Sequence, residues 1–259
     1  NQKWGIILLI AGLAFSILAG FMQVTIYIFG SYLLWNIYYW RVQAVGIDKK
    51  KIIPILIATV LAIGLTSIQW LPALEAYLLS ARPVVGGKFI FELFLMPLQH
   101  LATFIAPDFW GNPGSYNYFF PKVFYHDRVI YIGILPLIFA IYAYFKVKVA
   151  EVKFWKIFSL ITLSLGFALP TSWVWYVLRV PVLSVAHPGR IFVLSTFGLA
   201  VLAAFGLEKY LQKPDKALMK KILVFLSIML LALWGFVIMA QFLIRNYSAL
   251  YPACKTAGD

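Results

Sequence analysis

The stretch Ile222–Ile244, ILVFLSIMLLALWGFVIMAQFLI, decides the fold class of this protein. It contains no Asp, Glu, Lys or Arg and exceeds the roughly 20 apolar residues that a helix needs to cross the hydrocarbon core of a bilayer. Lipid offers no hydrogen-bond partners, so the backbone N–H and C=O groups of a membrane segment must bond to one another, and in an α-helix they all do. The stretch therefore predicts a transmembrane helix.

Six further stretches have the same uncharged, apolar character. They are Trp4–Met22, Val24–Trp40, Ile52–Leu71, Val129–Phe145, Ile157–Leu178 and Ile191–Leu207. The alternation of apolar and polar residues expected of a membrane β-barrel is absent, and the runs are long for strands. With 63% hydrophobic residues and a mean hydropathy of +0.89, the chain does not have the composition of a soluble globular protein. We predict an all-α, polytopic transmembrane helix bundle of about seven spans, of which the fifth is the weakest because Pro170 ends or kinks it.

Basic residues predict the orientation of the bundle. Of the 22 Lys and Arg residues, 14 precede the first span or fall in the gaps after the second, fourth and sixth spans. These are Lys3, Arg41, Lys49, Lys50, Lys51, Lys146, Lys148, Lys153, Lys156, Lys209, Lys213, Lys216, Lys220 and Lys221. Short basic loops are retained in the cytoplasm, so we expect a multi-pass plasma-membrane protein with its amino end inside and its carboxyl end outside.

Several functional classes are disfavoured by the sequence. The net charge of +13 sits in short loops between apolar spans, where topology and anionic headgroups explain it, so nucleic acid is not an expected partner. Dinucleotide, phosphate-loop and zinc-binding motifs are absent, and three His residues with the single Cys254 are too widely spaced for a metal centre. We expect no cofactor, although a divalent metal is not excluded.

We treat residues 1–259 as a single transmembrane domain with two long outer loops, at about 73–128 and 170–190. The first loop contains Phe89–Ile105, whose pattern suits helices that lie along the membrane surface or re-enter it. Such helices either cover the bundle as a cap or form a roof over a cavity for a lipid-linked substrate. The stretch Gly111–Pro121 is rich in Gly, Pro and Asn and predicts an irregular loop.

Five motifs, in the same order, resemble those of the YfhO-type bacterial membrane proteins of the C-type glycosyltransferase superfamily. They are Gly20–Tyr27; Gln69–Glu75 with Ser80 and Arg82; Ala106–Gly111; Tyr131–Leu137; and His187–Arg190 leading into Leu199–Glu208. The resemblance implies a membrane enzyme that moves a sugar from a polyprenyl-phosphate donor to an extracytoplasmic cell-envelope glycan or polymer. The alternatives are a lipid or polysaccharide transporter, and a non-catalytic protein of envelope assembly.

In that family the catalytic acidic residue lies in the first outer loop of the full protein. This chain opens with Asn1 directly before a span, so we expect a fragment that lacks the catalytic loop and is inactive alone. Its catalytic residue is therefore left unassigned.

The resemblance implies substrate-binding roles for residues in the matched motifs. Arg82 and Arg190 are candidates to bind the donor phosphate, because a guanidinium fork stabilises the charge that develops there; the alternative for each is an interfacial anchor. His187 belongs to the same motif as Arg190. Glu75 either orients an arginine or sugar hydroxyl or, as we favour, is a structural carboxylate. Asp108 is a further candidate, although a turn-forming role is favoured.

The tripeptide His126-Asp127-Arg128 forms a compact polar cluster just before the fourth predicted span. Histidine is suited to proton transfer near neutral pH. The sequence gives no indication whether this cluster faces a cavity.

Overall fold

The computed structural model describes residues 2–42, 49–80, 95–117, 124–178, 183 and 187–250. Within these ranges every regular element is a helix, and the one isolated β-bridge joins Met96 to Phe167. The α-helices are α1 (Gln2–Leu18), α2 (Met22–Val42), α3 (Lys49–Leu65), α4 (Ser67–Leu79), α7 (Ile134–Lys146), α8 (Ala150–Gly166), α9 (Val174–Val177), α10 (Phe192–Gln212) and α11 (Lys216–Leu250). The short 3-10 helices are η1 (Leu98–Phe104), η2 (Pro113–Ser115), η3 (Tyr125–Asp127), η4 (Pro170–Trp173) and η6 (Pro188–Ile191). The predicted all-α class is confirmed for this part of the chain.

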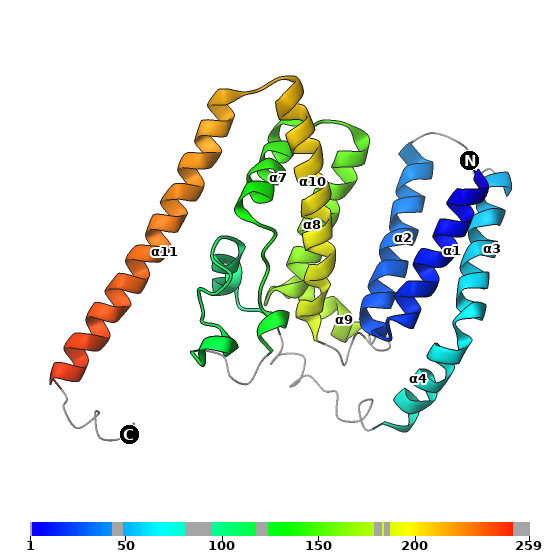
Figure 1. Ribbon diagram of the computed structural model, residues 1–259, viewed down its shortest axis with the longest axis horizontal. Helices are drawn as coiled ribbons and strands as arrows, with labels where there is room; N and C mark the ends of the chain where they lie inside the picture. Colours follow the sequence, from blue (N-terminus) through cyan, green and yellow to red (C-terminus); the bar gives the residue numbers. More distant parts are fainter. Residues whose placement is uncertain are drawn as a thin grey trace.

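Helix α10 packs against both α7 and α8 in the centre of the molecule (Figure 1). Their shared core includes Ala140, Ala143 and Leu202. A Cβ atom added to Gly206 of α10 would stand 1.9 Å from the carbonyl oxygen of Phe139 on α7. Small residues of this kind let helix backbones approach closely, as is common between membrane helices.

The other long helices flank this centre. Helix α1 packs against both α2 and α3, while α2 also contacts α8, α10 and η6. Helix α11 joins α7 through Ile222 and Leu226 near its start and then diverges from the bundle (Figure 1). Most of its large apolar side chains are exposed.

The chain runs up and down between two ends of the molecule. The start of α1, the end of α2, the α7–α8 connection and the α10–α11 connection all lie at one end, at the top of Figure 1. The starts of α2 and α10 and the ends of α4 and α11 lie at the opposite end. The basic residues that predict the cytoplasmic side flank the first end.

Two helical segments are long and apolar enough to cross a bilayer: Pro188–Gln212 and Lys216–Asn246. Ile52–Leu65 and Ser67–Leu79 meet this test only together, and they are bent by 69° at their junction. Lys3–Leu18 and Ile134–Lys146 are apolar but shorter. Length and composition of the described helices therefore support two spans, or three if the bent pair is one span.

Three helices are shorter than the predicted spans: two end earlier and one begins later. The first stops at Leu18, because Gly20 adopts a left-handed φ of 73° that turns the chain into α2. The fourth becomes helical only at Ile134, after Gly133 with φ 93°. The fifth stops at Gly166, where the backbone bonds to Met96 instead, and Pro170 then begins η4.

The bend between α3 and α4 is centred on Thr66. Its hydroxyl donates to the carbonyl oxygens of Ala62 (2.8 Å) and Ile63 (3.2 Å). The indole nitrogen of Trp70 donates to the same Ile63 carbonyl at 3.0 Å. Hydroxyl groups that bond back to the preceding turn bend helices, and here they also satisfy carbonyls that the break leaves open.

The first long loop contains one short helix within the predicted interfacial stretch, as far as it is described, and its position at a membrane surface stays a prediction. Its residues 95–105 contain η1, which packs inward with His100 and Thr103 buried; residues 89–94 lie outside the described part. In the next segment, Asn112 caps the single turn of η2 and Tyr116 is left-handed. The predicted irregular loop is thus confirmed for residues 111–117, and residues 118–121 lie outside the described part.

Candidate functional site

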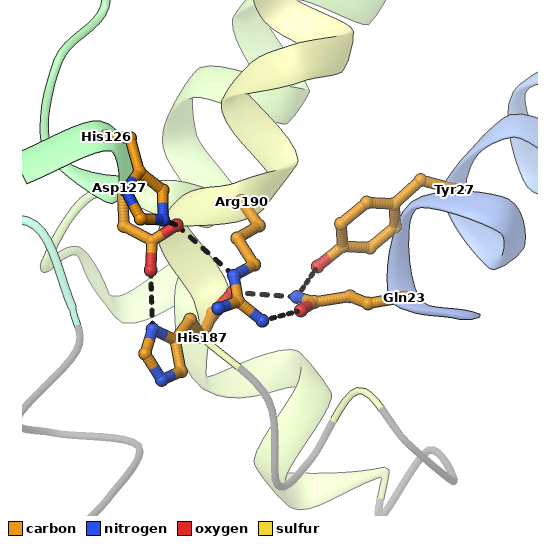
Figure 2. Close-up of polar contacts among 6 residues, drawn as sticks. All are labelled: Gln23, Tyr27, His126, Asp127, His187 and Arg190. Atoms are coloured by element: carbon orange, nitrogen blue, oxygen red, sulfur yellow. Dashed lines mark hydrogen bonds and ion pairs between the residues drawn. The ribbon is translucent and has the colours of Figure 1, made fainter. Parts of the chain in front are cut away.

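A buried carboxylate, that of Asp127, is the centre of the most extensive polar cluster in the described part of the chain (Figure 2). Its side chain is only 7% exposed. One carboxylate oxygen lies 2.7 Å from His187 Nδ1, and the other accepts a hydrogen bond from Arg190 Nε at 3.2 Å. Two segments about 60 residues apart in the sequence, η3 and η6, therefore meet at this ion pair.

Helix α2 supplies the third side of the cluster. Gln23, in its first turn, accepts a hydrogen bond from Arg190 Nη1 at 3.3 Å through its side-chain oxygen. The amide nitrogen of Gln23 donates to the Tyr27 hydroxyl at 2.9 Å and to the His187 carbonyl oxygen at 2.7 Å. Each polar atom of this buried amide thus has a partner, which fixes both Gln23 and the guanidinium that it holds.

A close backbone approach is needed to form the cluster. A Cβ atom on Gly189 would stand 2.8 Å from the Asp127 carbonyl oxygen. Real Cβ atoms do not come this near to a carbonyl oxygen, so only glycine lets η6 lie against η3. Pro188 precedes it at the start of the short helix, a position where proline is favoured. The His187-Pro188-Gly189-Arg190 motif therefore has a local structural explanation.

Electrostatics keep Asp127 ionised. Burial alone would raise the pKa of Asp127, but the hydrogen bond from His187 and the charge of Arg190 outweigh it, and the pKa lies below its ordinary value. Because the Asp127 carboxylate can only accept, Nδ1 of His187 carries the proton of this hydrogen bond. In a neutral His187 the basic lone pair is then on Nε2.

Aromatic rings complete the surroundings. The Arg190 guanidinium lies 4.9 Å from the ring centre of Phe21, a cation–π arrangement. Phe124 stacks on both His126 and His187, at centroid distances of 5.5 Å and 5.9 Å. His126 itself is exposed, and its Nε2 lies 3.6 Å from Asp127.

The cluster borders a cavity of about 270 Å³ at the starts of α2 and α10. Asp127, His126 and Arg190 form its polar side, and Phe21, Val24, Val129, Gly189, Phe192, Val193 and Thr196 complete its lining. Arg190 uses Nε and Nη1 for Asp127 and Gln23, whereas its Nη2 bonds to none of the described residues. Nη2 is thus not used by the two side chains that hold the guanidinium in place.

The structure brings together two of the five predicted site residues, His187 and Arg190. Glu75 lies on an exposed face of α4 and forms no hydrogen bond or ion pair with any described residue. Asp108 is exposed in a turn, where it accepts hydrogen bonds from the Tyr125 hydroxyl and from Asn112 Nδ2. Arg82 lies outside the described residues.

Four members of the cluster are not among the predicted site residues: Gln23, Tyr27, His126 and Asp127. Gln23 and Tyr27 lie four residues apart on one face of α2 and belong to a matched motif. A glutamine at the start of an otherwise apolar stretch was the available signal, because polar groups in such stretches are usually paired or functional. Asp127 was part of the polar tripeptide, but its partners were distant in the sequence.

His100, outside the Asp127 cluster, is a buried histidine held in its neutral form. His100 is 1% exposed, and burial together with the positive charge of Arg128 lowers its pKa to about 4. His100 is therefore neutral at physiological pH and suits a structural role. No group of three or more His, Cys, Asp or Glu side chains able to hold a metal occurs among the residues that the structure describes.

No known protein family, curated protein or solved structure matches this chain. The resemblance to the YfhO-type proteins therefore stays a prediction from the sequence motifs.

Proposed function

We propose that the full-length protein is a multi-pass membrane glycosyltransferase that uses a polyprenyl-phosphate sugar and acts on an acceptor outside the cytoplasm. The observation that carries this proposal is Arg190, held in one orientation by Asp127 and Gln23 at the wall of a cavity. The five ordered sequence motifs support the same assignment. Two of them, Gly20–Tyr27 and His187–Arg190, supply most of the cluster.

The proposed setting is a plasma membrane crossed about seven times. Each predicted span is helical over at least part of its length, and the long helices α1, α2, α3, α7, α8, α10 and α11 alternate in direction along the chain. With the basic connections in the cytoplasm, the Asp127 cluster lies at the outer end of the helices. A lipid phosphate in the outer leaflet has its headgroup at that depth, so donor and cavity are at the same level.

The chemistry of transfer makes use of a fixed guanidinium. When a sugar leaves its lipid phosphate, negative charge develops on the phosphate oxygens, and a positioned cation stabilises this charge. Asp127 and Gln23 hold Arg190 before the donor binds, so little side-chain freedom is lost on binding. Arg190 Nε donates to Asp127, which leaves Nη2 to donate to the phosphate.

The test is sugar transfer by the full-length protein in lipid nanodiscs at limiting donor. Arg190→Gln should lower kcat/KM by about 10²–10³, the range for loss of one charge-stabilising group. Arg190→Lys keeps the charge but loses the fork and should be intermediate. Arg245→Gln, a matched change of an arginine near the outer end of α11, should have no effect.

Because Arg190→Gln leaves the Asp127 charge without its main partner, the double variant Asp127→Asn/Arg190→Gln separates folding from chemistry. The double variant restores a neutral cluster and should regain thermal stability while staying poor in transfer. Equal transfer by wild type and all Arg190 variants would remove Arg190 from the site. Movement of labelled lipid between leaflets without any transfer would support the transporter alternative.

A further inference from the structure

A groove of about 670 Å³ lies between α2 and α3, beside α1. Residues of α2 and α3 form its two walls, with Ile17 of α1 and Trp70 of α4 at its outer end. Both α2 and α3 pack on α1 (Figure 1). The groove is therefore a fixed feature of the amino-terminal helices.

The length of the groove restricts what fills it. Its lining on α2 extends from Met22 to Trp40, which corresponds to about 27 Å along a helix. The hydrocarbon core of a bilayer is about 30 Å thick, so a lipid chain confined to one leaflet reaches only about half of that depth. A single occupant that fills the groove must have a chain longer than that of an ordinary membrane lipid.

Most polar side chains in the groove already bond to backbone carbonyl oxygens, whereas the Tyr32 hydroxyl, which also lines the groove, is buried without a hydrogen-bond partner among the described residues. Thr25 donates to the Ser16 carbonyl oxygen at 2.7 Å, Thr59 to that of Ile55 at 2.9 Å, and Asn36 Nδ2 to that of Tyr32 at 2.7 Å. The lining contains no Asp, Glu, Lys or Arg. The groove thus suits hydrocarbon, because a polar occupant would lose its hydrogen bonds to water without replacement.

The groove and the Arg190 cavity lie on adjacent faces of the first turn of α2. Met22 and Thr25 line the groove, whereas Phe21 and Val24, on the adjacent face of the same turn, line the cavity. A helix is about 10 Å across with its side chains. One molecule can therefore place a headgroup in the cavity and a chain in the groove.

We propose that the groove between α2 and α3 binds the single long isoprenoid chain of a lipid phosphate, with its phosphate in the cavity at Arg190. The placement of the phosphate rests on the proposed function. The placement of the chain rests on the length and apolar lining of the groove alone.

Gly30 offers a way to fill the groove without disturbing the fold. It lines the groove, and a Cβ atom added there meets no atom within 4 Å. Gly30→Phe should therefore block the groove. Gly235→Phe is the matched control, because Gly235 is also helical and open but lies on α11, away from the groove.

The experiment uses the full-length protein in phosphatidylcholine nanodiscs with a long-chain polyprenyl phosphate that carries a photoreactive group in mid-chain. Crosslinks should map to α2 and α3. Displacing a few methylene groups should lower their yield by about tenfold in Gly30→Phe and leave Gly235→Phe unchanged. Equal crosslinking to the exposed face of α11, undiminished yield in Gly30→Phe, or equal capture of a photoreactive phospholipid would overturn the proposal.

A parallel transfer assay distinguishes this proposal from the proposed function. A donor with a short prenyl chain should be used equally by wild type and Gly30→Phe, since its chain does not reach the blocked position. Groove crosslinks without sugar transfer would overturn the glycosyltransferase assignment and leave the chain site standing. Sugar transfer without groove crosslinks would support the glycosyltransferase assignment and overturn the chain site.

Discussion

Replacement of Asp127 by Asn tests the central interaction of the cluster. The substitution keeps the shape of the side chain but removes the charge that faces Arg190 Nε at 3.2 Å and His187 Nδ1 at 2.7 Å. Removing one partner of a fully buried ion pair costs about 3–5 kcal/mol. Asp127 is 7% exposed, but Arg190 is 22% exposed and regains some hydration, so we expect a loss of about 2–3 kcal/mol.

In a chain of this size each kcal/mol lowers the melting temperature by about 2–4 °C. Thermal unfolding in detergent at neutral pH should therefore show Asp127→Asn melting about 5–10 °C below wild type. Asp108→Asn is the control, because Asp108 is exposed, and it should fall by no more than about 2–4 °C. A similar fall for both variants would show that the Asp127 cluster is not a buried ion pair.

The same pair of proteins gives a pH test. The pKa of Asp127 lies below its ordinary value of 3.8, so its contribution to stability is fully present above that value and is lost as the pH falls through the depressed pKa. The difference in melting temperature between wild type and Asp127→Asn should therefore stay constant between about pH 5 and 7 and shrink only in stronger acid. A difference that disappears near pH 6 would assign the effect to histidine instead.

Three further predictions concern packing, capping and topology. Gly206→Ala should lower the melting temperature by several degrees, because its Cβ would meet the Phe139 carbonyl, whereas Gly235→Ala, which meets nothing, should leave it equal or higher. Asp215→Ala should lower the melting temperature by removing both the cap of α11 and the ion pair with Lys146, and Asp215→Asn, which keeps the capping oxygen but loses the charge, should be intermediate. Cys254, which lies outside the described residues, should react with a membrane-impermeant maleimide in intact cells; labelling only after permeabilisation would contradict the orientation.

The helical class was predictable because it depends on local composition. Each long uncharged stretch, such as Ile222–Ile244, is helical in the structure over most of its length. The helix ends were predicted less well. Phe167, for example, is apolar and fits a continuing helix, but the adjoining backbone bonds to Met96, about 70 residues earlier in the chain. Such pairing leaves no signal in the local sequence.

The candidate site was predictable only where its residues lie close together in the sequence. Arg190 and His187 belong to a compact motif beside a span and were recognised as candidates. Asp127 and Gln23 complete the site from elements that are distant in the sequence and come together only in the folded chain. Thr66 likewise looks like an ordinary residue within a predicted span, although its hydroxyl bonds position a 69° bend.

That bend has a consequence for how the chain fits its bilayer. As one straight helix, the 17 residues of α3 and the 13 residues of α4 would extend about 45 Å, half as long again as a hydrocarbon core of about 30 Å. With the 69° turn, α4 adds only about 7 Å along the axis of α3, for a total of about 32 Å. Where the bent pair forms one span, the break at Thr66 relieves a hydrophobic mismatch that tilt or bilayer thickening would otherwise have to absorb.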